Sequence, residues 1–187
     1  MKAFKRGVIS LSTILLVSSS GLFASEVEHE QHGSHVHGEA QLLVAIEGDS
    51  LEIEFLSPAM NIVGFEHQPR NEAQIEAIAS ATDTLKRPDL LFTISPAAKC
   101  TAESIEVESP PVDHEMHDHG IHHHEEEGHN DFTGHYHYKC TDIQQLERIG
   151  VELFKLFQGT EAIQAQTISK RGQQKIDLTP GHTTLEL

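Results

Sequence analysis

Residues 36–56 read VHGEAQLLVAIEGDSLEIEFL, and this stretch decides the fold because it predicts a β-hairpin. From Val36 to Ile46 every second residue is small or apolar, and most of the residues between are polar, which is the period of a strand. The triplet at 48–50 is a turn sequence, and residues 51–56 alternate again. We therefore expect two antiparallel strands with one apolar face each.

The remaining elements predict an α+β fold. Asn71 is a suitable helix N-cap with Gln74 three residues later, and an apolar helical face follows until the chain reaches Pro88. A second helix is predicted from its cap at Asp142 to about Gly159. Further strands are expected at residues 90–94, 104–108, 132–140, 162–169, 174–178 and 184–187. Two helices should pack on a mainly antiparallel β-sheet, with a long disordered insertion rich in His, Asp and Glu.

The strand at 132–140 has two different faces. Tyr136 and Cys140 fall on one face, and His135 and His137 fall on the other. Because Cys140 is expected to form a disulfide, the tyrosine face should belong to the core and the two imidazoles should point outward.

The first residues have the features of a secretory signal. Residues 1–24 carry three cations, an apolar run at 8–17 and small residues up to Ala24, which predicts cleavage after that alanine. The alternative is a retained anchor, but the apolar run is short and interrupted by serine and threonine. We then expect a mobile, histidine-containing tail at 25–34 and a single α+β metal-binding domain at 35–187.

The charge of the chain excludes several classes of partner. Cleavage would remove three cations and no acids, so the formal charge would change from −16 to −19. Nucleic acids and anionic membranes bind clustered Lys and Arg, so neither is an expected partner, and no stable membrane anchor is expected. Cations are the expected partners.

Two cysteines, Cys100 and Cys140, are present. In an exported protein two cysteines most often form a disulfide, and a bond of this span contributes about 4 kcal/mol in the chain-entropy model. The alternative is a metal site with thiolate ligands. The disulfide would tether a mobile loop at residues 110–131 to the folded core.

Within that loop, residues 113–131 read DHEMHDHGIHHHEEEGHND, with seven histidines and seven carboxylates. Neutral imidazole and carboxylate are ligands for Zn(II), Ni(II) and Cu(II), so the composition predicts metal capture. The alternative is a solvated polar loop without function. The candidate ligands are His114, His117, His119, His122, His123, His124 and His129.

Histidines in predicted strands are the candidates for an ordered site. His35 and His37 lie two residues apart with Glu39 next in line, and His135 and His137 repeat this spacing. If the two strands are neighbours, four imidazoles converge and a tetrahedral site becomes possible. The alternative is that both pairs belong to solvent-facing strand surfaces.

His67 stands before the first helix in the sequence GFEH at 64–67, with Glu66 as its possible helper. It is either a metal ligand or a packing or capping residue. The sequence contains no hydrolase, phosphate-binding or free-thiol motif, so we expect neither catalytic nor cofactor-binding residues and no enzymatic activity.

Several of these segments together resemble a known family. HVHGEAQL at 35–42, SPAMN at 57–61, GFEH at 64–67, the central acidic histidine loop and the aromatic strand ending at Cys140 are similar to the ZrgA-like family of periplasmic zinc-binding proteins. The resemblance covers essentially the whole mature chain. It implies a Gram-negative periplasmic protein that binds zinc and assists zinc uptake by passing the metal to an importer.

The sequence thus predicts a zinc metallochaperone that captures Zn(II) through the loop and the ordered histidines. Ni(II) and Cu(II) should also bind in vitro, since the ligands accept them. Two alternatives stay open: a zinc buffer without a delivery partner, and an exported structural or adhesive protein whose histidines respond to pH. The sequence makes no prediction of the oligomeric state.

Overall fold

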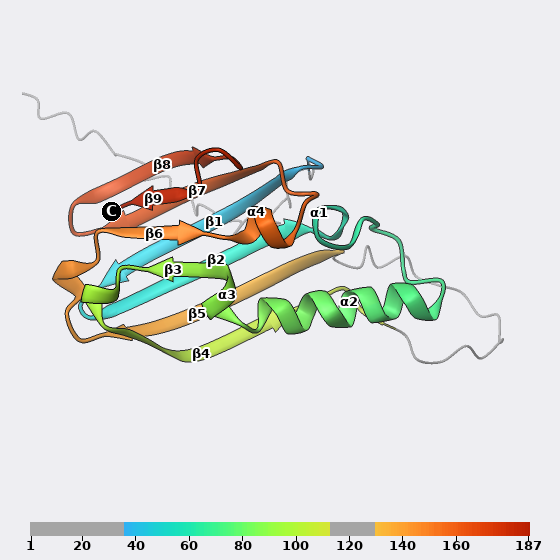
Figure 1. Ribbon diagram of the computed structural model, residues 1–187, viewed down its shortest axis with the longest axis horizontal. Helices are drawn as coiled ribbons and strands as arrows, with labels where there is room; N and C mark the ends of the chain where they lie inside the picture. Colours follow the sequence, from blue (N-terminus) through green and yellow to red (C-terminus); the bar gives the residue numbers. More distant parts are fainter. Residues whose placement is uncertain (1–35, 113–129) are drawn as a thin grey trace, which may run out of the picture. The chain divides into compact units, whose positions relative to one another are not determined.

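The predicted hairpin lies at the centre of a six-stranded sheet. The structure is a computed structural model that describes residues 36–112 and 130–187 (Figure 1). β1 (Glu39–Glu47) and β2 (Ser50–Pro58) pair antiparallel across a turn in which Gly48 has a φ of 63°. Alternate side chains of both strands are buried, as the period of two predicts.

The sheet extends on both sides of this hairpin. β5 (Asp131–Cys140) and β4 (Cys100–Glu108) follow β2, while β7 (Ala162–Ser169) and β8 (Gly172–Leu178) follow β1. The strand order is therefore β4-β5-β2-β1-β7-β8. β7 runs parallel to β1, and the other neighbours in this sheet are antiparallel.

A three-stranded sheet and the longest helix of the described residues lie on one face of the six-stranded sheet (Figure 1). The small sheet has the order β3-β6-β9, formed by β3 (Phe92–Ile94), β6 (Arg148–Val151) and β9 (Thr184–Glu186). The helix is α2 (Glu72–Leu85). Inward side chains from all three layers form one apolar cluster, whereas the outward side chains of β1, β2 and β5 are mostly exposed.

Short helical segments connect these elements. They are α1 (Ala59–Val63), α3 (Pro88–Leu91), α4 (Leu153–Leu156) and two 3-10 turns, η1 (Pro96–Ala98) and η2 (Ile143–Gln145). The predicted α+β class with mostly antiparallel strands is confirmed, with four α-helices among the described residues. None of these helices has the length and hydrophobicity that a membrane span requires.

The first predicted helix is confirmed in detail. The Asn71 side chain accepts a hydrogen bond from the Gln74 backbone N–H at 3.0 Å, as its N-cap position predicts. At the other end, the Tyr136 hydroxyl donates to the carbonyl of Leu85 at 3.0 Å. The ring of Tyr136 also meets Phe92 edge-on, with centroids 5.2 Å apart. These contacts hold the end of α2 against β5, and burial raises the pKa of the Tyr136 phenol.

The second predicted helix is wrong. After Asp142 the chain forms η2, β6 and α4. Ile149 and Val151 are fully buried because β6 pairs with both β3 and β9. Ser95 supports this pairing, since its hydroxyl accepts hydrogen bonds from the backbone N–H groups of residues 147–148. Long-range strand pairing therefore overrides a helical apolar spacing.

Two other short strands differ from their predictions. The strand expected at 90–94 is shortened to β3 because Pro88 starts the helical turn α3, which contains residues 90 and 91. The strand expected at 184–187 is present as β9 but pairs with β6 in the small sheet.

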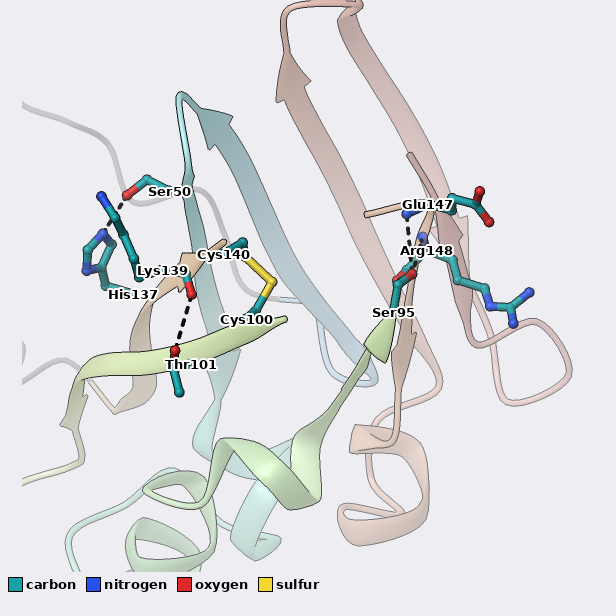
Figure 2. Close-up of a disulfide and its surroundings, with 9 residues drawn as sticks. All are labelled: Ser50, Ser95, Cys100, Thr101, His137, Lys139, Cys140, Glu147 and Arg148. Carbon is teal, nitrogen blue, oxygen red and sulfur yellow. Dashed lines mark hydrogen bonds between the residues drawn. A yellow bond between two sulfur atoms is a disulfide. The ribbon is translucent and has the colours of Figure 1, made fainter. Parts of the chain in front are cut away.

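The predicted disulfide between Cys100 and Cys140 is confirmed (Figure 2). The two residues lie directly opposite each other on β4 and β5, with Cα atoms 3.9 Å apart. Both cysteines of the chain are thereby used, so thiolates are excluded as metal ligands. The bond joins one end of the β4–β5 ladder, and the pair of Glu108 with Thr133 forms the other end.

Candidate metal centre

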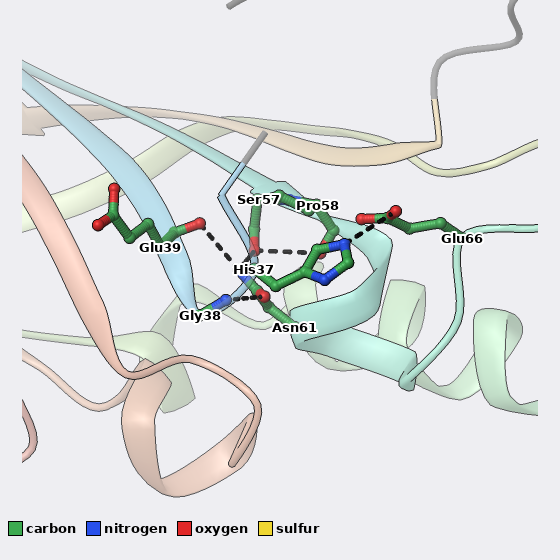
Figure 3. Close-up of polar contacts among 7 residues, drawn as sticks. All are labelled: His37, Gly38, Glu39, Ser57, Pro58, Asn61 and Glu66. Carbon is green, nitrogen blue, oxygen red and sulfur yellow. Dashed lines mark hydrogen bonds and ion pairs between the residues drawn. The ribbon is translucent and has the colours of Figure 1, made fainter. Parts of the chain in front are cut away.

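A buried asparagine organises the end of the sheet at which β1 begins (Figure 3). Asn61 in α1 is only 2% exposed. Its Oδ1 accepts from the backbone N–H of Gly38 at 2.7 Å, and its Nδ2 donates to the carbonyl of Glu39 at 2.8 Å and to the hydroxyl of Ser57 at 3.3 Å. Because buried backbone groups need partners, this side chain fixes the turn before β1 against α1.

His37 lies in that turn and not in a strand. β1 begins at Glu39, and Gly38 has a φ of 86°, a value that glycine adopts readily and that turns the chain away from the strand direction. The prediction that a strand carries His37 is therefore wrong. His35, its predicted partner, lies outside the described residues.

The turn places His37 next to the carboxylate of a residue that follows α1 in the sequence. The helix ends at Gly64, whose φ of 82° forms a left-handed cap, and the chain then carries Glu66 back toward the turn. His37 Nε2 lies 3.1 Å from Glu66 Oε2. Among the described residues, the other oxygen of Glu66, Oε1, is buried without a hydrogen-bond partner. We name His37 and Glu66 the turn pair; imidazole and carboxylate are both zinc ligands.

His67 follows the turn pair in sequence. Its Nδ1 lies 2.8 Å from the carbonyl of Gln68, and its ring stacks on Phe65 with centroids 5.2 Å apart. Since a carbonyl can only accept, Nδ1 carries the proton and Nε2 has the free lone pair, an arrangement typical of metal-ligating histidines. Within residues 36–112 and 130–187, however, no three His, Cys, Asp or Glu side chains are placed to share one ion.

Glu39 is separate from the turn pair. Its carboxylate is exposed, points away from His37 in Figure 3, and lies 3.5 Å from the Nε2 of Gln164 on β7. The backbone carbonyl of Glu39 accepts a hydrogen bond from Asn61, and this bond helps to fix the turn that carries His37.

His135 and His137 point outward from β5, as predicted, while the tyrosines between and beside them are buried. The expected convergence of four imidazoles is wrong because β2 lies between β1 and β5. Instead, His135 Nδ1 lies 3.9 Å from Glu54 Oε2, and His137 Nδ1 lies 3.6 Å from Glu103 Oε2. The structure thus forms two separate histidine regions.

The residues that follow the histidine-rich segment in the sequence lie against the start of α1. The carbonyl of Asn130 accepts from the backbone N–H of Ala59, the first residue of α1, at 2.8 Å. Asp131 pairs with Pro58 at the same end of the sheet. The predicted ligands of the loop itself lie outside the described residues: His114, His117, His119, His122, His123, His124 and His129.

Sequence reasoning found the histidines but missed most of their partners. It assigned no role to Asn61, although a polar residue within the apolar run AMNIV at 59–63 is a signal of a buried hydrogen-bonding position. Glu54 and Glu103 were also missed, because only the strand register places them beside histidines.

Comparison with known proteins agrees with a role in zinc biology. No curated protein matches the chain. The profile of a family described as "ZrgA family zinc uptake protein" matches residues 34–187, a range that includes the turn pair, both outward histidines of β5 and the disulfide. The chain therefore belongs to the ZrgA family of zinc uptake proteins.

Proposed function

We propose that this protein is an exported, periplasmic zinc-binding protein that captures Zn(II) and assists uptake by handing the ion to an importer. Family membership supports the zinc role, and the N-terminal signal features support export. The protein acts by binding and release rather than by catalysis, in line with a sequence that contains ligand-type residues but no catalytic motif.

The observation that carries this proposal is the turn pair. An imidazole nitrogen and a carboxylate oxygen 3.1 Å apart, beside a second carboxylate oxygen without a partner among the described residues, form half of a zinc coordination shell. The side chains are 59% and 33% exposed, so an ion can reach them from solvent. His35 and His67 are close in sequence to His37 and Glu66 and are the candidates for the remaining ligands.

The histidine-rich segment supplies a second, less selective step. Its seven histidines offer many overlapping ligand sets, which suits rapid capture of zinc at low affinity. Its C-terminal attachment at Asn130 is hydrogen-bonded to the first residue of α1, and α1 carries Asn61, which holds the turn. In this proposal, ions collected by the segment are passed on to the turn pair.

A zinc titration tests this assignment. The mature chain, with all seven loop histidines replaced by asparagine to remove competing ligands, is titrated against a chromophoric zinc chelator. Glu66→Gln removes the anionic ligand with little change of shape, so we expect zinc affinity to fall about 10- to 100-fold. His182→Asn is the matched control, since His182 is exposed and stands between β8 and β9, outside the segments that carry the turn pair. Equal affinity of the Glu66→Gln and control proteins would refute the site.

Uptake is tested in cells. Deletion of the gene should slow growth when zinc is limiting, and the intact protein should restore growth while the Glu66→Gln protein should not. The deletion strain could instead grow normally and contain less total zinc only after culture in zinc-rich medium. That result would indicate a zinc buffer that has no delivery role.

A further inference from the structure

The outward face of β2 and β5 carries a square of four ligand-type side chains. Glu52 is the direct cross-strand partner of His137, and Glu54 is the direct partner of His135. Directly opposed side chains on one sheet face have Cβ atoms about 5 Å apart, and residues two apart on a strand are about 7 Å apart. We name these four residues the sheet array; all four point to the same side, away from the core.

The imidazole of His137 has one nitrogen that is free of a proton. His137 Nδ1 lies 3.6 Å from the carboxylate of Glu103, which favours a proton on Nδ1. His137 Nε2 then accepts the 2.6 Å hydrogen bond from the hydroxyl of Ser50, visible in Figure 2. Nε2 is therefore the unprotonated nitrogen that a metal ion uses, and its present partner is a hydroxyl that can turn to water instead.

The array lines an open hollow of about 360 Å³ on this face. Leu43 and Ala45 of β1 border it on one side, and Ser104 and Glu106 of β4 border it on the other. Glu106 is the cross-strand partner of His135 from that side. The residues that line the hollow include three carboxylates and no Lys or Arg, so their negative charge has no cation within the hollow.

The lysine that follows the sheet array on β5 is already paired. Lys139, two residues beyond His137, lies 2.7 Å from the carboxylate of Asp49. The hydrogen bond from Lys139 holds the pKa of Asp49 below its usual range, so Asp49 stays ionised and keeps the ammonium group. The ammonium group of Lys139 is therefore held by Asp49 and not by the carboxylates of the hollow.

From this register, orientation and charge we propose that the sheet array binds Zn(II) through His135, His137, Glu52 and Glu54, as a second site independent of the turn pair. The array shares no residue with the turn pair. In their present positions no three ligand-type side chains of the described residues meet around one point, so zinc binding at the array requires the side chains to rotate toward a common ion. The side chains of His135 and Glu54 are each 48% exposed, which leaves room for that rotation and for release of the ion. A surface site of this kind suits exchange of zinc with a partner better than long-term storage.

Zinc stoichiometry measured by equilibrium dialysis tests the proposal. The mature protein with its seven loop histidines replaced by asparagine is compared with the same protein carrying His135→Asn and His137→Asn, or Glu52→Gln and Glu54→Gln. The first double variant should lose one zinc equivalent, and the second should bind that equivalent about tenfold more weakly or worse. His182→Asn should bind as the parent does. Because the substituted side chains are mostly exposed, all variants should keep the parent melting temperature without metal.

Nitrogen NMR of the histidine rings provides a readout that does not depend on counting ions. On addition of zinc, the Nε2 resonances of His135 and His137 should shift in the parent and in the Glu66→Gln protein. Unchanged stoichiometry in the His135→Asn, His137→Asn variant, or unshifted Nε2 resonances, would overturn the sheet array. If only Glu66→Gln lost a zinc equivalent, the sheet array would be overturned and the turn pair would be supported. If only the array variants lost an equivalent, the sheet array would be supported and the turn pair would be refuted.

Discussion

The turn pair and the sheet array contain the same kinds of side chain but are positioned in different ways. The turn pair is held through a buried asparagine that fixes the backbone on which His37 stands. The sheet array is placed by strand register alone, and its side chains remain exposed and separate. In the turn pair an imidazole and a carboxylate are within 3.1 Å, whereas in the array the shortest carboxylate distance to His135 is 3.9 Å.

This difference predicts different metal chemistry. A site whose ligands are already placed loses little entropy on binding, so it should retain zinc more tightly. A site whose ligands must rotate together should bind more weakly and exchange faster. One small domain can thereby retain zinc at the turn pair, at the end of its sheet, and exchange zinc at the sheet array, on its open face.

Asn61→Ala should produce the largest effect and should act on the turn pair alone. It leaves the backbone N–H of Gly38 and the carbonyl of Glu39 without their partner, which costs about 3 kcal/mol in the free energy of unfolding. Zinc binding by the turn pair should weaken, since His37 loses its fixed backbone. Urea unfolding and the dialysis assay measure the two effects.

Asn71→Ala is the control for that substitution. It removes an exposed helix cap, costs about 1 kcal/mol, and should leave zinc binding unchanged. If Asn61→Ala weakened the sheet array as strongly as the turn pair, the two regions would not be independent and the comparison would fail.

Local patterns predicted much of the fold but could not predict the partners of each strand. The β1–β2 hairpin, the capped helix α2, the buried tyrosine face of β5 and the disulfide all depend on neighbouring residues or on composition. The apolar residues at 146–157, by contrast, fit one long helix as well as the observed strand β6 and short helix α4. Only the pairing of β6 with β3 and β9 decides between these structures.

The candidate site shows the same limit. The sequence identified His37 and His135 as ligand candidates, because residue type carries ligand chemistry. It could not show that β2 separates β1 from β5, since hydrophobic period does not encode strand order. It also could not show that Asn61 links two segments 23 residues apart.

Gly159→Ala should have an intermediate effect on the same end of the sheet. A Cβ at this position would lie 2.5 Å from the backbone carbonyl oxygen of Asn61, so the backbone must shift. We expect a loss of about 2 kcal/mol in the free energy of unfolding and a measurable loss of zinc affinity at the turn pair. Gly181→Ala is the matched control, because its Cβ would meet no atom within 4 Å. Equal stability of the two variants, measured in urea, would mean that the turn tolerates movement of α1.

Charge substitutions beside the sheet array should give the smallest effects, with opposite signs. Lys139→Gln removes a cation next to the hollow and leaves Asp49 unpaired, so zinc affinity of the array should rise about threefold at low ionic strength. Asp49→Asn frees the ammonium group of Lys139 and should lower the affinity by a similar factor.

Both effects should shrink in concentrated salt, because exposed charges are screened over a few ångströms there. Lys86→Gln, at the end of α2 on the other face, changes the net charge equally and serves as the control. Equal changes in Lys139→Gln and Lys86→Gln would show that zinc responds to total charge and not to the sheet array. Opposite responses of Lys139→Gln and Asp49→Asn would place the ion on the open face. Lys139 is paired with the first residue of β2, whereas the turn pair lies at the other end of that strand.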